Sequence, residues 1–254
     1  MFTLGLVSIT FRKHTPEEIL DACVKCGLSA IEWGSDVHVP VGDLARAAEV
    51  RAMSEKAGVR IAAYGSYYKL GEPDNDEKRM RAYLESAKAL GAPMIRIWGG
   101  KKASDQFLRA DRAAFVSELK TFTSLAKTYG ITLALECHRD TITDEYHNTF
   151  ALLKEVGADN LTSFWQPLQS RTESYNLDSA AAHAPFVRHI HVFHWDTDEW
   201  YPLGEGHDIW CKYLAPFKGT NTDLMLEFMH DNRMESLAST VEALRAIVRD
   251  AEAN

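Results

Sequence analysis

The chain has 254 residues, of which 46% are hydrophobic, and its formal net charge at pH 7 is −8. This length is typical of one (β/α)8 barrel, although two ordinary domains would also fit it. The acidic balance disfavours non-specific binding to nucleic acid and to an anionic membrane surface, because both depend on lysine and arginine.

The N-terminal segment and the cysteines indicate where in the cell the protein is expected to be. Met1 leads directly into an apolar run over residues 2–9, without a basic region or a small-residue cleavage pattern. We therefore expect no signal peptide, and no apolar stretch is long enough to span a bilayer. Cys23 and Cys26 form a C-x-x-C inside a helical pattern with no second pair, which favours helix packing over zinc. We expect a cytoplasmic protein with reduced thiols.

One pattern recurs along the chain: an amphipathic helix, then a glycine, then an apolar strand. The glycines that carry it are Gly27, Gly58, Gly91, Gly130 and Gly157. Glycine commonly follows the last residue of a helix, so each occurrence predicts a helix followed by a short loop and a strand. The repetition predicts serial βα units and a parallel sheet.

The predicted strands cover about residues 3–9, 30–33, 59–64, 94–98, 131–138, 161–166, 187–194 and 224–229. The predicted helices start near residue 16, cover about 44–57, 76–90, 111–129, 148–156 and 177–184, start again near 208 and end with 236–253. Eight alternating pairs predict a single (β/α)8 TIM barrel, with residues 1–254 as one domain. A doubly wound open sheet is the alternative, but residues 8–11 do not form the glycine-rich phosphate loop that it would carry.

The predicted strand over residues 131–138 alternates two kinds of side chain. Leu133 and Leu135 share one face, while Ala134, Glu136 and His138 share the other. A face of small groups fits the narrow interior of a barrel. The carboxylate and the imidazole then lie at the C-terminal end of the strand, where such barrels keep their chemistry.

Polar and aromatic side chains also collect at the other predicted strand ends. They are Glu32, Trp33, His38, Tyr64, Tyr67, Tyr68, Arg96, Trp98, Gln166, Gln169, His189, His191, His194, Glu227 and His230. Two glutamates and one histidine on three strands suit Mn²⁺, Mg²⁺, Co²⁺ or Zn²⁺ better than a structural zinc, which prefers thiolates. The alternative is that the two glutamates form buried ion pairs with Arg96, Arg139 or a histidine.

Together these residues resemble the xylose isomerase-like TIM barrels, a family that includes sugar and sugar-phosphate isomerases and epimerases, inosose dehydratase and endonuclease IV. The resemblance covers nearly the whole chain. It rests on short motifs at residues 30–34 with 37–40, 133–136, 189–192, 202–206 and 226–228. It suggests a homo-oligomer, either a dimer or a tetramer.

The resemblance implies one divalent metal ion, held by Glu136, Gln166, His191 and Glu227. The family usually has Asp-x-x-His where this chain has Gln166 and Gln169. An amide oxygen can bind a metal but brings no charge, so we expect weaker binding and a stronger Lewis acid, or loss of the metal. Mn²⁺ is the first expectation, with Mg²⁺, Co²⁺ and Zn²⁺ as alternatives.

The resemblance also implies an isomerase or epimerase acting on a keto-sugar or related polyol. One of Glu136 and Glu227 would remove the proton next to the carbonyl to give an enediolate, and the other would return a proton. The predicted substrate-binding residues are His38, Trp98, His138, Gln169 and His194. Because no late glycine-rich anion cradle is present, we expect a free sugar rather than a phosphate.

Three other functions stay open. The first is a lyase, since the same enolate could expel a β-hydroxyl or glycosyl group or lose CO₂. The second is a DNA-repair nuclease, which would need more His and Asp ligands and a basic groove; the charge of −8 counts against it. The third is a metal-free sugar-binding barrel that has lost its ion through Gln166.

Overall fold

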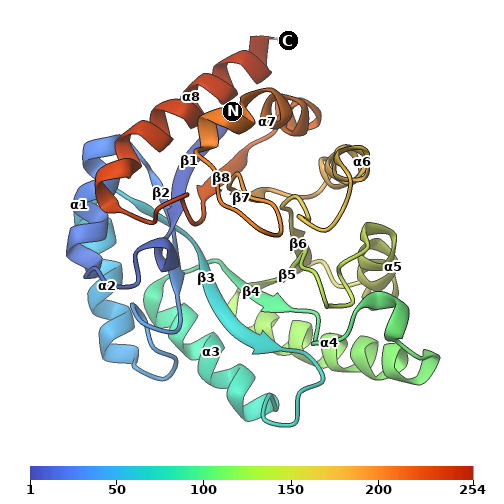
Figure 1. Cartoon of the computed structure of the whole chain (residues 1–254). Helices are drawn as coiled ribbons and strands as arrows, with labels where there is room; N and C mark the ends of the chain where they lie inside the picture. The colour runs from blue at the N-terminus through green and yellow to red at the C-terminus, as the bar shows by residue number, and fades with distance from the viewer. Residues whose placement is uncertain (254) are drawn as a thin grey trace. The chain divides into compact units, whose positions relative to one another are not determined.

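The computed structural model describes residues 1–253, in which strands and helices alternate (Figure 1). The strands are β1 (Phe2–Val7), β2 (Ala30–Gly34), β3 (Arg60–Lys69), β4 (Met94–Trp98), β5 (Thr132–Glu136), β6 (Leu161–Phe164), β7 (His189–Val192) and β8 (Thr222–Leu226). The α-helices are α1 (Pro16–Cys26), α2 (Leu44–Ala57), α3 (Glu77–Leu90), α4 (Arg109–Tyr129), α5 (Tyr146–Val156), α6 (Glu173–His183), α7 (His207–Leu214) and α8 (Leu237–Ala253).

These strands belong to one sheet with the order β6-β5-β4-β3-β2-β1-β8-β7. Each strand is followed by a helix, and this order with this alternation is that of a (β/α)8 barrel, so the predicted fold class is confirmed. By its contacts the chain divides into two compact units, and β2 and α2 are each shared between them. The expectation of one domain over the whole chain stays a prediction.

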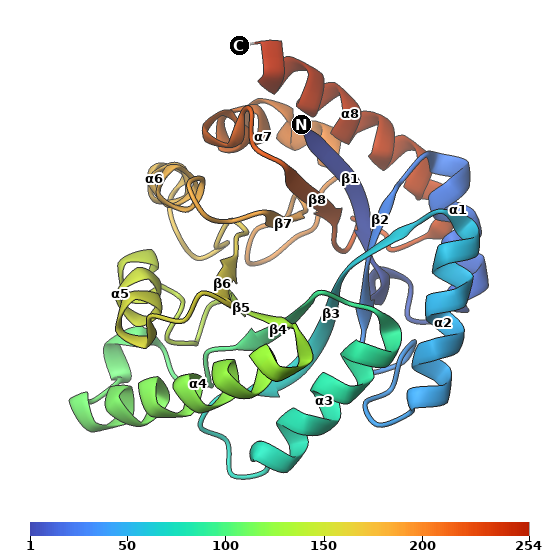
Figure 2. The same cartoon turned by 180° about the vertical axis from the view of Figure 1, so that it is seen from behind.

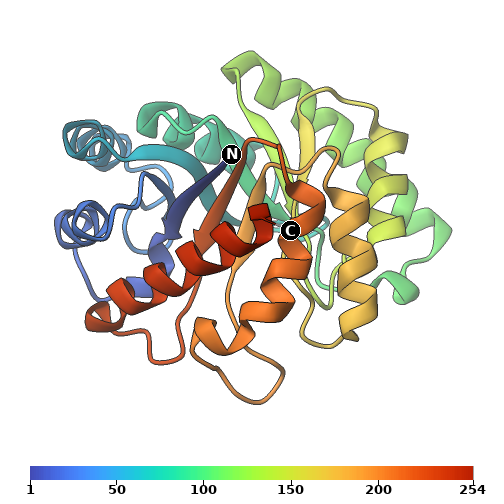
Figure 3. The ribbon, with the colours of Figure 1, turned by 90° about the horizontal axis from the view of Figure 1, so that it is seen from above.

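The first unit comprises residues 1–32, 53–60 and 165–254. In it β1 pairs in parallel with both β2 and β8, and β8 pairs with β7. Helices α7 and α8 lie side by side at its surface, as Figure 3 shows. The register places His189 opposite Asp223 and His191 opposite Met225, so both histidines lie beside β8.

The second unit comprises residues 33–52 and 61–164. Strands β3, β4, β5 and β6 pair in parallel in chain order, and α3, α4 and α5 follow one another along them (Figure 2). Ala63, Ala134 and Phe164 form a small buried cluster between these strands, with Met94 against it. The small side chain predicted at Ala134 is therefore on a buried face.

Helix starts and ends follow their sequence signals closely. The Thr15 side chain accepts a hydrogen bond from the Glu18 N–H, and the Glu18 side chain accepts one from the Thr15 N–H, which forms a capping box. Gly27 has a φ of 67°, and the other four predicted helix-ending glycines also have positive φ. The helix–glycine–strand interpretation is confirmed, because these positions take the left-handed conformation that favours glycine.

Several element boundaries differ from the prediction. Strand β1 ends at Val7, and a 3₁₀ turn over Ser8–Phe11 follows; all four of its residues are buried, so hydrophobicity alone could not mark the change. Strand β3 runs on to Lys69. Helix α6 begins at Glu173, four residues earlier than predicted, because the Thr172 side chain caps it by accepting from the Tyr175 N–H.

Gly5 in β1 is needed for close packing inside the first unit. A Cβ at this position would lie 2.6 Å from Met225 Sδ and 2.7 Å from the Ala30 carbonyl oxygen. The absence of a side chain therefore lets Met225, two residues before Glu227, fill the space between β1 and β8.

Among the helices over residues 1–253, none has the length and apolar character needed to cross a membrane.

Candidate functional site

His191 is the centre of a buried polar cluster in the first unit. It lies in β7 and its side chain is fully buried. One ring nitrogen, Nε2, lies 3.0 Å from Glu32 Oε2. The other, Nδ1, lies 3.2 Å from Gln166 Oε1 and 3.3 Å from Glu227 Oε2. The imidazole therefore has a different partner set on each side.

Backbone pairing brings these side chains together. The Trp165 N–H donates to the His189 carbonyl, and the His191 N–H donates to the Trp165 carbonyl, each at 3.1 Å. These two bonds hold Gln166, the next residue, beside β7. The Glu227 N–H donates to the Val192 carbonyl at 3.0 Å, so Glu227 also stands at the C-terminal end of β7. The predicted ligands Gln166, His191 and Glu227 are thus neighbours in the structure.

Glu32 joins the two histidines of β7. Its Oε2 atom lies 2.9 Å from His189 Nε2 and 3.0 Å from His191 Nε2, and the three side chains are at most 1% exposed. Donor atoms of these three residues lie close enough to hold a cation. However, a carboxylate oxygen accepts hydrogen bonds, and both separations are ordinary N–H···O lengths. We interpret this group as two imidazole N–H groups that donate hydrogen bonds to one carboxylate oxygen.

The charges of this cluster follow from burial and the two carboxylates. Burial alone lowers the pKa of His191, but Glu227 and Glu32 outweigh it and raise that pKa to about 10. For His189, burial dominates over the hydrogen bond to Glu32, and its pKa is lowered. Positive charge in the cluster is therefore favoured at His191, between the two carboxylates, and not at His189.

The side of His191 that carries Nδ1 fits a divalent metal ion. One imidazole nitrogen, one amide oxygen and one carboxylate oxygen converge there, and all three side chains are at least nine-tenths buried. A neutral imidazole has a lone pair on one nitrogen, and a lone pair facing two oxygens is unfavourable unless a cation or a proton lies between them. The donor set of nitrogen and oxygen suits Mn²⁺, Mg²⁺, Co²⁺ or Zn²⁺.

Glu136 lies in the second unit as the last residue of β5 and is buried. Its Oε2 atom lies 3.3 Å from the Arg96 guanidinium, and both side chains are almost fully buried. The buried ion pair that the sequence left open as an alternative is therefore present for Glu136. Thr143 Oγ1 also donates a hydrogen bond to the Glu136 carbonyl oxygen at the strand end.

Three predicted substrate-binding residues belong to the second unit. Trp98 and His138 stack with ring centroids 4.5 Å apart, and Lys69 Nζ lies 4.3 Å from the centre of the Trp98 ring. Both stacked rings are partly exposed. His38 is 2% exposed and packs edge-on against Trp33, so it is a core residue, and its role as a hydroxyl binder stays a prediction.

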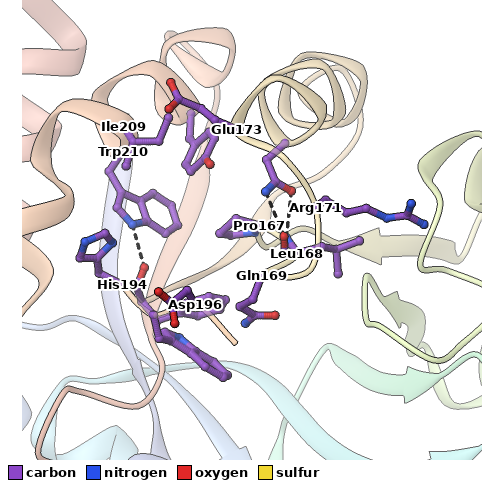
Figure 4. A pocket seen from close by; sticks show the side chains of 13 residues that line it. Pro167, Leu168, Gln169, Arg171, Glu173, His194, Asp196, Ile209 and Trp210 are labelled. Carbon is purple, nitrogen blue, oxygen red and sulfur yellow. Dashed lines mark hydrogen bonds between the residues drawn. The ribbon is translucent and has the colours of Figure 1, made fainter. Parts of the chain in front are cut away.

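The other two, Gln169 and His194, line one cavity of about 230 Å³ in the first unit (Figure 4). The cavity lies between the loops that follow β6 and β7 and the helix α7. Asn176 accepts from the Leu168 N–H and donates to its carbonyl, which holds the first loop. A Cβ on Gly206 would lie 2.6 Å from His194 Nδ1, so the glycine of the 202–206 motif makes room for this imidazole.

Comparison with known proteins identifies the family. A model of the xylose isomerase-like TIM barrels matches residues 20–249, and the chain belongs to this family. A curated relative, the 3-dehydroshikimate dehydratase of Bacillus anthracis, is 25% identical over 120 residues. That match spans 46% of this chain and 42% of the relative, which is less than half of either.

Solved structures share the fold at low identity. The probable 3-DHS dehydratase AsbF of Bacillus anthracis is 19% identical with a TM-score of 0.79, covering 96% of this chain and 99% of that one. The IolI protein with a bound zinc atom is 16% identical with a TM-score of 0.74, covering 99% and 98%. The 3-keto-D-glucoside 4-epimerase YcjR of E. coli is 12% identical with a TM-score of 0.75, covering 98% and 100%.

Two residues of the cluster, Glu32 and His189, do not belong to the predicted site. Their sequence positions mark them only as individual polar residues at strand ends. The available signal was Glu32 itself, a carboxylate inside the buried strand β2, since an unpaired charge there would be costly.

Proposed function

We propose that this chain is a divalent-metal-dependent enzyme that transfers a proton at the carbon next to the carbonyl of a keto-sugar or related polyol, as an isomerase or epimerase. The observation that supports it is the convergence of Gln166 Oε1, His191 Nδ1 and Glu227 Oε2 in the first unit. Glu136 is proposed as the fourth ligand on the family resemblance alone. Mn²⁺ is the first choice of ion.

A divalent ion held by these residues would supply Lewis acidity to the substrate carbonyl. The chain itself would supply the proton transfer. Glu227 is 5% exposed at the end of β8, and in its charged form it can accept the proton from the carbon next to the carbonyl. The electron pair of that C–H bond then forms an enediolate, and proton return at the neighbouring carbon, or on the opposite face, completes an isomerisation or an epimerisation.

The cavity lined by Gln169 and His194 is proposed to bind the substrate's hydroxyl groups. Burial lowers the pKa of His194, which favours a neutral imidazole that can both donate and accept a hydrogen bond. The Trp210 ring contributes an apolar wall and is held by its N–H bond to the Phe193 carbonyl at 2.8 Å. The lining also carries two carboxylates, Glu173 and Asp196, against one guanidinium, Arg171, and this excess of negative charge disfavours a phosphate group.

A dehydratase is the second candidate, because the curated relative is named as one. Its first step is the same removal of a proton next to a carbonyl. The outcome differs at the next bond, since the electron pair of the enolate forms a C=C bond and expels the β-hydroxyl group, which takes up a proton and leaves as water. The proposal therefore covers the first step for both reactions and prefers isomerisation for the second.

The test begins with the metal content of the chain purified without chelator, measured by elemental mass spectrometry. About one equivalent of a divalent metal is expected, or uptake of one equivalent of added Mn²⁺. The loaded protein is then incubated in D₂O with a panel of keto-sugars, keto-glycosides and 3-dehydroshikimate, and products are followed by NMR and mass spectrometry.

Deuterium at the carbon next to the carbonyl in a product of unchanged composition supports an isomerase or epimerase. Loss of water from the substrate supports the dehydratase instead. A chain that takes up no metal contradicts the metal-dependent mechanism, and saturable sugar binding without metal would identify the third candidate, a sugar-binding barrel.

A further inference from the structure

We propose that Glu32 is a positioning residue that determines which nitrogen of His191 faces the metal ligands. The inference rests on the proposed function, because it concerns the same metal site. It assigns Glu32, which makes no predicted contact with metal or substrate, the task of holding the proton on His191 Nε2.

Glu32 Oε2 faces ring nitrogens of two histidines. This one oxygen lies within hydrogen-bond distance of Nε2 on His189 and of Nε2 on His191, at 2.9 and 3.0 Å. A carboxylate oxygen can only accept, so each of these nitrogens carries a proton that points at it. Two donors from one strand to one acceptor keep both rings in a fixed orientation.

The proton on Nε2 determines the state of the opposite edge of His191. With the proton on Nε2, the lone pair of a neutral ring lies on Nδ1, which is the edge that faces Gln166 Oε1 and Glu227 Oε2. This is the nitrogen that can bind a cation together with those two oxygens. A carboxylate on the far nitrogen also raises the basicity of the ligating one and fixes the ring.

His189 holds the other side of Glu32. It is buried, and its Nε2 lies 2.9 Å from the same carboxylate oxygen, so its hydrogen bond fixes the position of Glu32. The carboxylate of Glu32 is itself fully buried on β2. The negative charge of Glu32 lies against Nε2 of His191 and stabilises a positive charge on that ring or a cation bound to its Nδ1. Glu32 therefore does more than pack.

The experiment observes the protons directly. The chain is labelled with ¹⁵N-histidine, and long-range ¹H–¹⁵N correlation spectra are recorded with chelator and again with added Zn²⁺; His189→Gln and His191→Gln assign the signals. We expect a hydrogen-bonded proton on Nε2 of both rings in both states, and the change on adding Zn²⁺ at Nδ1 of His191. A zinc-dependent change at Nε2, or a ring without its Nε2 proton, overturns the inference.

A second measurement tests the consequence for binding. Isothermal titration with Mn²⁺ compares the wild-type chain, Glu32→Gln, and Glu242→Gln as a control, an exposed carboxylate on α8 paired with Arg245. We expect Glu32→Gln to weaken Mn²⁺ binding by roughly 10- to 100-fold and the control to leave it unchanged. Unchanged affinity in Glu32→Gln contradicts the positioning role.

The two measurements separate this inference from the proposed function. If the wild-type chain binds no metal, the proposed function fails, yet the Nε2 protons in the metal-free spectrum still test the link from Glu32 to the two histidines. If Glu32→Gln does not fold, the spectra of the wild-type chain decide alone.

Discussion

Gln166 Oε1 lies 3.2 Å from Nδ1 of His191, at the position where the resemblance in the sequence implies a carboxylate. An amide oxygen that close to an imidazole nitrogen keeps the ligand geometry while it removes one negative charge. The chain is therefore expected to bind its ion, but with less charge compensation than a site with aspartate at this position would give.

Replacing Gln166 with aspartate restores that charge. We expect Gln166→Asp to tighten Mn²⁺ binding by about tenfold or more, equivalent to roughly 1.4 kcal/mol, because the added carboxylate attracts the ion directly. Isothermal titration checks this, with the exposed substitution Gln106→Asp as the control for net charge. Equal affinity in Gln166→Asp and wild type would exclude Gln166 from the ligand set.

Replacing Glu227 with glutamine removes the proposed proton acceptor. Glu227→Gln keeps the size and an oxygen, but a neutral amide cannot take up the proton, so we expect deuterium exchange at the substrate carbon to fall by about 10²- to 10⁴-fold. Metal content must be measured in the same sample, because lost metal would lower the rate for another reason. Full exchange in the metal-loaded variant would show that another residue removes the proton, and Glu136 would be the first candidate.

His183 makes stability depend on pH. It is the last residue of α6, buried, and its Nδ1–H donates to the Ser179 carbonyl at 2.7 Å. Burial lowers its pKa to about 4, while the unfolded chain keeps the ordinary value near 6.5. As pH falls between these values the unfolded state takes up a proton that the folded state does not, so stability falls by up to about 3 kcal/mol.

Urea unfolding at pH 7 and at pH 4.5 checks this, in the wild type and in His183→Gln. The variant has no group that titrates at this position, so its stability should decrease less over the same interval. An identical decrease in both proteins would assign the pH dependence to other residues.

Gly5 and Gly204 provide a test position and a control position for close packing at a glycine. A Cβ on Gly5 would lie 2.7 Å from a backbone carbonyl oxygen, whereas a Cβ on Gly204 would meet nothing closer than 3.8 Å, and neither glycine has a positive φ. We expect Gly5→Ala to lower the free energy of unfolding by about 1–3 kcal/mol and Gly204→Ala to change it little. Chemical denaturation measures both, and equal effects would contradict the close approach at β1.

The local signals in the sequence determined the elements. Five glycines after helical patterns, the capping box at Thr15, and the alternation over residues 131–138 act between near neighbours in the chain, so they could be interpreted without a structure. The same alternation placed Glu136 at a strand end, and the repeated βα units led to the barrel. Such patterns follow from the repeat of a helix, about 3.6 residues, or of a strand, about two residues, and both repeats involve only residues that are close in the chain.

The tertiary structure decided which strand-end residues meet. Nothing near Glu32 in the chain indicates that its carboxylate accepts from two histidines more than 150 residues away. The same is true of Arg96, which the sequence offered only as one of several possible partners for Glu136. Contacts of this kind depend on sheet register and on the rotation of each side chain, and those are decided only when the strands pack together.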